Sequence, residues 1–472
     1  MHDLRSFLQL AGPAVWRIPT AVDPRYELTA LQHQLDESGR FPILLASNIS
    51  TLRGERSPIP VVTNLTASRE LTARALGIPD SRSVASWFAR RSAEAIAPRV
   101  LAREQAPVQQ VVWRGDEASL LRLPVLTQHE TEPGPYLTAA HATTVDLDTG
   151  TDNTAIQRCW VQSARRMSWF PYPASHNRRN LRKFWERGEP CPVAFWIGHH
   201  PAVLLGSQSK LHYPQSHWSA TGGVLGEALR VVPSVLHGER IMVPADAEIV
   251  IEGFAPPNVM ANDGPFGEYT GYLGAQVQAP VVEVSCITMR HDAIYHDYAS
   301  GLTDMLVPDN LAMEGKLFQL VKAVAPSLLN VHVPTEGRRF HAYLQLRNPG
   351  SSEVRDALTA ALAYRRVKTV IAVDESTDIF SPQAMLWALG TRVQWSRDSL
   401  IIDGLSGSSL DPSLPPGVSN ASKMGVDATL ATLRAAGQLV PIATSPREAR
   451  ALAAKMLAGL AGAQSSEHWP RF

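Results

Sequence analysis

Residues 262–272 read Asn262-Asp263-Gly264-Pro265-Phe266-Gly267-Glu268-Tyr269-Thr270-Gly271-Tyr272, and this stretch holds two carboxylates five positions apart. Between Asp263 and Glu268, glycine permits unusual backbone angles and proline fixes one of them, so we expect a rigid turn. Two acids held at defined positions suit general acid–base chemistry, because their surroundings can push their pKa values apart. On residue type alone, however, most such pairs lie in solvated loops and take no part in chemistry.

The composition is that of an ordinary globular protein. A length of 472 residues predicts roughly two or three domains, and 44% hydrophobic with 19% charged residues is typical of such a chain. Lysine plus arginine equals aspartate plus glutamate at 44 each, so no overall charge favours nucleic acid or a membrane surface. We see no N-terminal signal segment and no apolar run of about 18 residues. The three cysteines form no CxxC pair, which indicates no disulfide framework and suits a cytoplasmic protein.

The expected secondary structure changes along the chain. Residues 1–39 favour a helix followed by extended segments, and residues 81–105 carry apolar side chains at helical spacing. Between 107 and 300, short β-type runs alternate with glycine and proline. These runs are Pro107–Trp113, Leu137–Val145, Val193–Ile197, Ala247–Ile251 and Val281–Thr288.

The second part of the chain reads as α/β. Residues 310–325 predict a long amphipathic helix. Phe340–Leu346, Ser352–Tyr364 and Thr369–Val373 then predict a strand–helix–strand unit. Residues 445–462, which open with Ser-Pro-Arg-Glu and are rich in alanine and leucine, predict a final helix.

The turn at 262–272 resembles the signature E-G-P-F-G-E-x-x-G-Y of the UbiD family, the prenylated-flavin-dependent (de)carboxylases. Four further stretches are similar to strings of that family and occur in the family's order. They are Asn48 with Pro60–Gly77, Val243–Gly253, Trp387–Arg392 and Ser422–Thr429. Because five ordered strings span the chain from about residue 40 to about residue 430, the chain is identified as a member of this family.

The resemblance implies an α/β (α+β) fold. In it, a split-β-barrel flavin-binding domain is joined by a linker helix to a smaller α/β oligomerisation domain with a C-terminal helix. The implied bounds are 1–305 for the catalytic domain that binds prenylated FMN (prFMN), 306–328 for the linker helix, 329–440 for the oligomerisation domain and 441–472 for the C-terminal helix. A homodimer or a higher homo-oligomer is therefore expected.

The resemblance also implies site residues. The segment expected to lie along the cofactor, together with two residues of a later loop, comprises Asn153, Thr154, Ala155, Ile156, Gln157, Arg158, Ser175 and His176. Arg158, Asp263 and Glu268 match the family's acid–arginine–acid set. Glu268 would donate a proton, Arg158 would hold the substrate carboxylate with its planar fork, and Asp263 would orient Arg158. On residue type alone, a structural salt bridge would be the more common role for such an arginine.

Two positions depart from the family pattern. Asn153 and His176 match two ligands of a divalent cation, Mn²⁺ or Mg²⁺, that bridges to the flavin phosphate, and the resemblance also allows a K⁺ ion. The third ligand should be a glutamate, but His217 stands there, which makes the expected site softer and less negative. In addition, Asp263 replaces the usual glutamate, so its carboxylate lies roughly 1.5 Å further back.

The implied activity is a reversible, non-oxidative decarboxylation. The substrate would be an aromatic, heteroaromatic (indole- or pyrrole-type) or α,β-unsaturated carboxylic acid, CO2 would be released, and a separate prenyltransferase would supply the prenylated flavin. The aromatic residues that could line a flat pocket, or equally belong to the core, are Trp160, Trp169, Phe266, Tyr269 and Tyr272.

Three alternatives stay open. Net carboxylation would use the same site in reverse. A non-catalytic flavin-binding subunit of a (de)carboxylase assembly is permitted by the altered Asp263 and His217. A metal-dependent hydrolase could use Asn153, His176 and His217, although this set lacks a carboxylate and is a poor zinc site. The sequence has no P-loop, no G-x-G-x-x-G that opens a helix and no nucleophile elbow, so nucleoside triphosphate chemistry and serine hydrolysis have no support.

Overall fold

The computed structural model describes residues 3–415 and 417–463, with the side chains of residues 458–463 excepted. The chain divides into two compact units, Met1–Thr429 and Leu430–Phe472. The first unit contains the β-sheets and the candidate site. The second contains the helices α12 (Ala431–Ala435) and α13 (Arg447–Ala463), so the final helix predicted from the sequence is confirmed.

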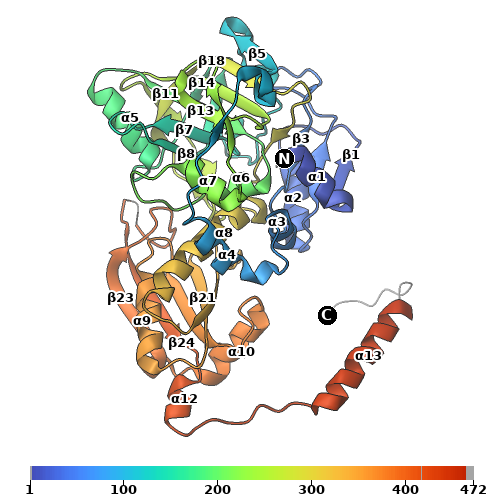
Figure 1. Cartoon of the computed structure of the whole chain (residues 1–472), viewed down its shortest axis with the longest axis vertical. Coiled ribbons are helices and arrows are strands. Elements are labelled where there is room, and N and C mark those ends of the chain that lie inside the picture. The colour runs from blue at the N-terminus through green and yellow to red at the C-terminus, as the bar shows by residue number, and fades with distance from the viewer. Residues whose placement is uncertain (1–2, 416, 464–472) are drawn as a thin grey trace. The chain divides into compact units, whose positions relative to one another are not determined.

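An antiparallel sheet of ten strands forms the centre of the first unit (Figure 1). Its order is β6-β9-β10-β18-β14-β11-β7-β8, and β5 and β15 pair with β18 beside this path. The path is curled and open, as expected for a split barrel, and the predicted mixed α/β fold is confirmed. The strands are β5 (Val111–Arg114), β6 (Tyr136–Leu137), β7 (His141–Val145), β8 (Asp152–Ile156), β9 (Cys159–Ser163), β10 (Arg166–Ser168), β11 (Cys191–Ile197), β14 (Ile249–Ala255), β15 (Met260–Asp263) and β18 (Val277–Met289).

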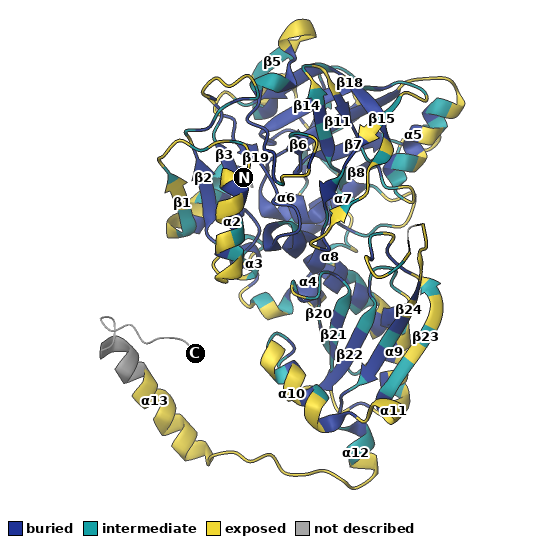
Figure 2. Ribbon diagram, turned by 180° about the vertical axis from the view of Figure 1, so that it is seen from behind, coloured by how far each residue is buried: buried dark blue, intermediate teal, exposed yellow. Residues whose placement is uncertain are grey.

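The central sheet is covered on both faces. Strand β11 is buried along its whole length, which Figure 2 shows in dark blue. Val193 and Phe195 pack into one hydrophobic core, whereas Ala194 and Trp196 pack into another. Because successive side chains of a strand point to opposite faces, β11 separates two cores and is held rigidly between them.

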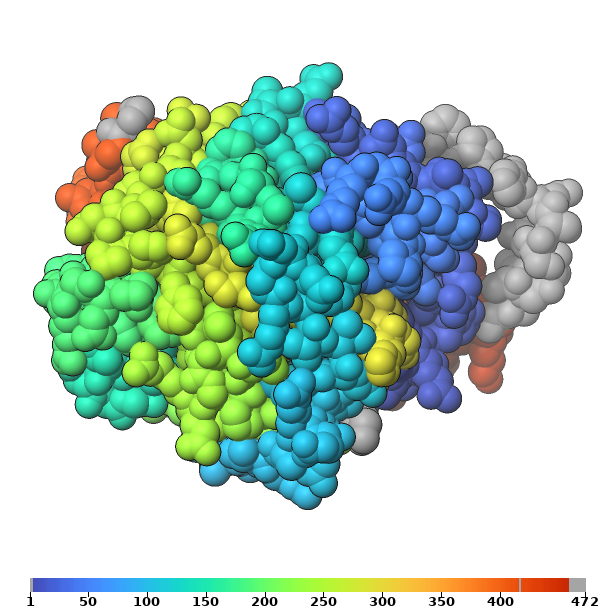
Figure 3. Space-filling view, turned by 90° about the horizontal axis from the view of Figure 1, so that it is seen from above, coloured from blue at the N-terminus to red at the C-terminus, as the bar shows by residue number. Residues whose placement is uncertain are grey.

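The N-terminal segment adds a smaller sheet with the order β1-β2-β3-β19. Its last strand comes from much later in the chain and ties this sheet to the central part. In the space-filling view, the N-terminal segment in blue lies directly beside segments coloured cyan and yellow (Figure 3). The elements are α1 (Leu4–Ala11), β1 (Val15–Ile18), α2 (Glu27–Glu37), β2 (Ile43–Ala46), β3 (Val61–Thr63) and β19 (Tyr295–His296).

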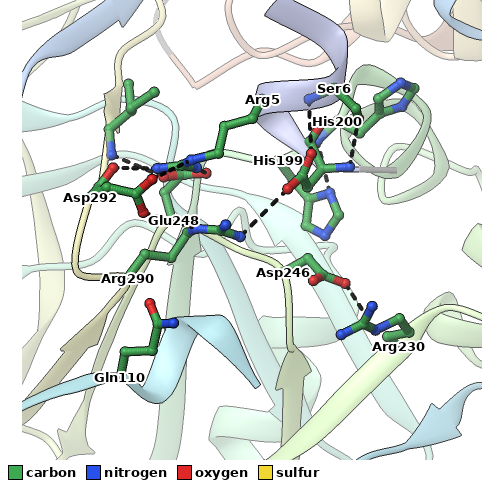
Figure 4. Close-up of polar contacts among 12 residues, drawn as sticks. Arg5, Ser6, Gln110, His199, His200, Arg230, Asp246, Glu248, Arg290 and Asp292 are labelled. Carbon is green, nitrogen blue, oxygen red and sulfur yellow. Dashed lines mark hydrogen bonds and ion pairs between the residues drawn. The ribbon is translucent and has the colours of Figure 1, made fainter. Parts of the chain in front are cut away.

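Ion pairs fix helix α1 to the rest of the unit (Figure 4). Arg5 contacts the buried carboxylate of Glu248 and the exposed carboxylate of Asp292. The distance from Nε of Arg5 to Oδ2 of Asp292 is 2.8 Å. Burial raises the pKa of Glu248 to about 7, although Arg5 acts in the opposite direction. The side chain of Glu248 is fully buried, so its main partner is the guanidinium that α1 brings to it.

Helix α8 (Thr303–Lys322) leads into a second sheet with the order β20-β21-β22-β24-β23. Strands β21 and β22 are parallel and are connected by helix α9, which confirms the strand–helix–strand unit predicted from the sequence. Met313, Leu317 and Val321 of α8 enter the same core as this sheet. The elements are β20 (Leu328–His332), β21 (His341–Leu346), α9 (Ser351–Leu362), β22 (Thr369–Asp374), α10 (Pro382–Arg392), α11 (Trp395–Asp398), β23 (Ser399–Ser406) and β24 (Asn420–Asp427).

Two sequence-based expectations about helices are wrong. The helix expected at 81–105 is only α4 (Val84–Arg91), because the backbone beyond it pairs elsewhere. Ile96 donates to the carbonyl of Ser219, and Arg99 donates to that of Leu229. In the region read as extended, α2 forms instead. None of the described helices is both long and apolar enough to cross a membrane. Further elements are α3 (Arg69–Ala75), β4 (Arg99–Val100), α5 (His176–Glu186), α6 (Pro201–Gly206), α7 (His217–Leu225), β12 (Arg230–Ser234), β13 (Gly238–Pro244), β16 (Phe266–Gly267) and β17 (Leu273–Gly274).

Candidate active site

The turn at 262–272 is as constrained as its sequence predicts. Strand β15 ends at Asp263, which pairs with Val277 of β18, and the short strands β16 and β17 close the turn as a hairpin. Gly264 adopts φ +84°, a conformation that favours glycine, and its N–H donates to the hydroxyl of Tyr136 at 2.8 Å. Both ends of the turn are therefore held by backbone contacts, which gives the two acids defined positions.

Arg158 lies between the two acids. Its Nε donates to Oδ2 of Asp263 at 2.8 Å, and its Nη1 contacts Oε1 of Glu268. The side chain of Arg158 is 9% exposed, that of Asp263 is fully buried and that of Glu268 is 16% exposed. The predicted set of three residues is thus brought together from two separate segments of the chain, the segment that carries Arg158 and the turn that carries both acids.

The two acids differ in how fully they are bonded. The second oxygen of Asp263, Oδ1, accepts a hydrogen bond from Ser168 at 2.7 Å. The second oxygen of Glu268 makes no hydrogen bond to any residue that the structure describes. Asp263 is consequently fixed through both oxygens, whereas Glu268 keeps one oxygen available for chemistry.

Two aromatic rings lie against the Arg158 guanidinium. Its Cζ lies 4.7 Å from the ring centroid of Phe170 and 4.9 Å from that of Phe266. Such contacts favour a cation and keep water away from it. Burial raises the pKa of Glu268, and the neighbouring charge of Arg158 only partly offsets this effect. A glutamate with a raised pKa holds its proton at higher pH than an ordinary one, as a general acid must.

The expected cofactor segment runs along an edge of the sheet. Strand β8 ends the strand order, so one of its edges has no partner strand in the described sheet and can bond a ligand. The side chains of Thr154 and Gln157 are turned to the interior, where they accept from Trp196 and Trp169. Ala155 and Ile156 are half-buried. These two half-buried side chains are uncharged.

The three expected metal ligands lie on β8, α5 and α7. The amide nitrogen of Asn153 donates to Asn177, which leaves its carbonyl oxygen free of this bond. His176 begins α5 and His217 begins α7. Burial, followed by the charges of His176 and Lys210, lowers the pKa of His217 to about 3, so this imidazole is neutral at pH 7.

No carboxylate completes this set. The nearest acid in sequence, Asp152, accepts from the N–H of Trp218 at 2.9 Å and from the hydroxyl of Ser216, and is used to cap α7. Among residues 3–415 and 417–463, no group of three or more His, Cys, Asp or Glu is placed to hold a metal ion. A hard divalent cation prefers oxygen ligands, so the donor set fits Mn²⁺ or Mg²⁺ poorly.

Several contact residues have no signal in the sequence. Ser168 and Tyr136 reach the turn only because the sheet order brings β10 and β6 to it. Of the aromatic residues considered for a pocket, Trp169 is fully buried in the core, and Tyr272 is 64% exposed. Phe266 alone of that group contacts the arginine of the site.

Comparison with known proteins identifies the class to which this open antiparallel sheet and its acid–arginine–acid set belong, the carboxy-lyases. Three models of 3-octaprenyl-4-hydroxybenzoate carboxy-lyase domains match the chain: the N-terminal domain at residues 14–91, the Rift-related domain at 99–302 and the C-terminal domain at 310–428. The chain belongs to the UbiD family and is a carboxy-lyase.

Individual relatives agree with this assignment. Anhydromevalonate phosphate decarboxylase of Methanothermobacter thermautotrophicus is 30% identical over 90% of this chain and 96% of its own length. The UbiD-class enzyme HmfF of Pelotomaculum thermopropionicum, solved in complex with FMN, is 33% identical with a TM-score of 0.87, over 95% of this chain and 98% of that one. An evolved dimeric form of HmfF has been solved with prFMN. Apo 3,4-dihydroxybenzoic acid decarboxylase of Klebsiella pneumoniae is 25% identical with a TM-score of 0.86, over 94% of this chain and 98% of that one.

Proposed function

We propose that the chain uses prFMN to decarboxylate an aromatic, heteroaromatic or α,β-unsaturated carboxylic acid, with Glu268 as the proton donor. The observation that carries this proposal is the contact of one buried arginine with two acids of unequal bonding. Enzymes similar to this chain over nearly its whole length have been solved with FMN and with prFMN. The same site run in reverse would carboxylate the product.

The residues that would hold the flavin lie along β8 and at the start of α5. Asn153 to Arg158, along and just beyond the free edge of β8, would hold it together with Ser175 and His176. The bound prenylated flavin would supply the electron sink that decarboxylation needs. Asn153, His176 and His217 remain candidate ligands for a divalent ion at a weak site, and K⁺ is a further candidate.

The chain's own residues divide the work. Arg158 is held in a dry site and would attract the substrate carboxylate, because its fork matches two carboxylate oxygens. Asp263 would keep Arg158 in place. Glu268 would give its proton to the carbon that has lost CO2, and its partial exposure would let water restore that proton before the next turnover.

The state of assembly belongs to the same proposal. Apolar side chains of α10, α11 and β23 are exposed on the described surface, with Leu386 at 70%, Trp395 at 57% and Ile401 at 65%. Exposed apolar residues can mark contacts with a partner, and an evolved form of the similar enzyme HmfF is dimeric. We propose a homodimer or higher homo-oligomer that receives its prenylated flavin from a separate prenyltransferase.

Glu268→Gln tests the proton donor. Glutamine keeps the shape and hydrogen bonding of the side chain but has no proton to transfer, so steady-state turnover of prFMN-loaded protein should fall by at least about 10²-fold. One equivalent of CO2 should still be released in a single turnover. The assay follows CO2 from a panel of aryl, heteroaryl and acrylic acids, with Glu283→Gln, an exposed glutamate of β18, as the control.

Two outcomes would contradict this proposal. Near-normal steady-state turnover by Glu268→Gln would place the donor elsewhere. Flavin binding without CO2 release from any acid of the panel would favour the non-catalytic flavin-binding subunit.

A further inference from the structure

Three cations meet one buried carboxylate beside the candidate site. Asp309 of α8 contacts Lys210, Arg339 and Arg366, with Nη1 of Arg339 at 3.1 Å from Oδ2. We call these four residues the basic cluster. Asp309 and Arg339 are 7% and 6% exposed, whereas about a quarter of the Lys210 side chain is accessible (25%). The cluster is therefore built into the interior but reaches a surface at Lys210.

The basic cluster has a net charge of +2, because its three cations face a single carboxylate. Within the described parts of the chain, no second carboxylate forms an ion pair with any of its three cations. The remaining bonds of Arg339 go to uncharged groups, the amide oxygen of Asn310 and the carbonyl of Met305. Burying unbalanced charge is unfavourable, so the cluster is suited to an anion that is bound from outside.

The cluster borders the segments that carry the candidate site. Lys210 precedes α7, and its charge helps to lower the pKa of His217. The ring of Tyr269, the residue after Glu268, lies 4.9 Å from the guanidinium carbon of Arg339 and 5.9 Å from that of Arg366. An anion held by the cluster would consequently lie near the segments that carry His217 and Glu268.

The loop before His176 approaches the same region. The guanidinium carbon of Arg365, the neighbour of Arg366, lies 4.7 Å from the ring centroid of Tyr172 and its Nη1 donates to the hydroxyl of that residue. The loop that carries Tyr172 thus lies next to the segment that carries Arg366.

We propose that the basic cluster binds a phosphate monoester and that this binding requires no divalent metal. A phosphate monoester carries about −1.5 to −2 charges at pH 7, which matches the charge excess of the cluster, and arginine forks suit phosphate oxygens. The cluster would then replace the cation that the incomplete set of Asn153, His176 and His217 holds poorly. The inference rests on the proposed function in so far as the cofactor is the expected phosphate monoester; a phosphate-bearing substrate is the other source.

The first arm of the test compares FMN with riboflavin, which lacks the phosphate. Binding to EDTA-treated apoprotein is followed by quenching of flavin fluorescence. The wild type should prefer FMN by about tenfold or more without added metal, and Lys210→Met should remove most of this preference while leaving riboflavin affinity unchanged. Lys210→Arg should restore it. Lys316→Met is the matched control, because Lys316 contacts His212 and not Asp309.

The second arm distinguishes the source of the phosphate. If the preference for FMN does not depend on Lys210, inorganic phosphate should instead stabilise the FMN-loaded wild type against heat, and not the Lys210→Met variant. This result would assign the cluster to a substrate phosphate.

Two results would overturn the inference. One is a preference for FMN that EDTA abolishes and Mn²⁺ restores. The other is the absence of any effect of Lys210→Met in both arms. If the protein releases CO2 but needs Mn²⁺ to bind FMN, the proposed function stands and this inference is refuted. If the protein binds FMN without metal but releases no CO2, this inference stands and the proposed function is refuted.

Discussion

Arg158→Met should destabilise the fold, and by an amount that depends on pH. The substitution keeps much of the apolar stem but leaves Asp263 fully buried and Glu268 mostly buried without their shared cation. Removing one partner of a buried ion pair typically costs about 3–5 kcal/mol. Arg158 opposes the rise that burial causes in the pKa of Glu268, so this pKa should rise further in the variant.

The pH dependence of the stability follows from this rise in the pKa of Glu268. A carboxyl group whose pKa is higher in the folded than in the unfolded state stabilises the fold below its unfolded pKa, and this stabilisation is lost as the pH rises through the folded pKa. One proton held only by the folded variant changes the free energy of unfolding by up to about 2.7 kcal/mol over two pH units. The amount by which Arg158→Met lowers the free energy of unfolding, its stability deficit, should therefore be smaller at pH 5 than at pH 7.

Urea denaturation followed by tryptophan fluorescence at both pH values measures this deficit. Arg165→Met is the control, since Arg165 is 50% exposed and pairs with an exposed Asp116 at 3.2 Å, and should change the free energy of unfolding by less than about 1 kcal/mol. A deficit of Arg158→Met that equals the control, or one that is the same at pH 5 and pH 7, would refute the reasoning.

Two further predictions concern the turn and the assembly. Gly267→Ala would place a Cβ 2.6 Å from Cε1 of His129, so we expect a loss of about 1–3 kcal/mol in stability. Because Glu268 would shift, activity should also fall, by up to about 10²-fold. Gly390→Ala, whose Cβ meets no atom within 4 Å, is the control, and equal behaviour of the two variants would show that the close contact is unimportant. Light scattering should give at least twice the 51.5 kDa mass of the chain at micromolar concentration, and a monomer mass would contradict the proposed self-association.

The parts of the site that could be predicted are those encoded locally. The turn at 262–272 contains its own glycines and proline, and the strand–helix–strand unit at 341–374 follows a regular apolar pattern. Ser168 could not be predicted as a partner of Asp263, because only the pairing of β10 and β15 with β18 brings them together. The basic cluster was missed for the same reason: Lys210, Asp309 and Arg366 stand far apart in the sequence. The prediction of a helix over 81–105 was wrong because the backbone beyond α4 pairs with Ser219 and Leu229, and this tertiary pairing overrides local helix propensity.

The aspartate at 263 and Glu268 are held differently. Its shorter side chain still reaches Arg158, at 2.8 Å, and it does so while Ser168 occupies its other oxygen. Such a carboxylate, fully buried and bonded through both oxygens, is fixed in place and has no oxygen left to contact a substrate. Glu268 has the longer side chain, partial exposure and a free oxygen. The replacement of glutamate by Asp263 therefore preserves the placement of Arg158 and agrees with the proposed role of Glu268 as the proton donor.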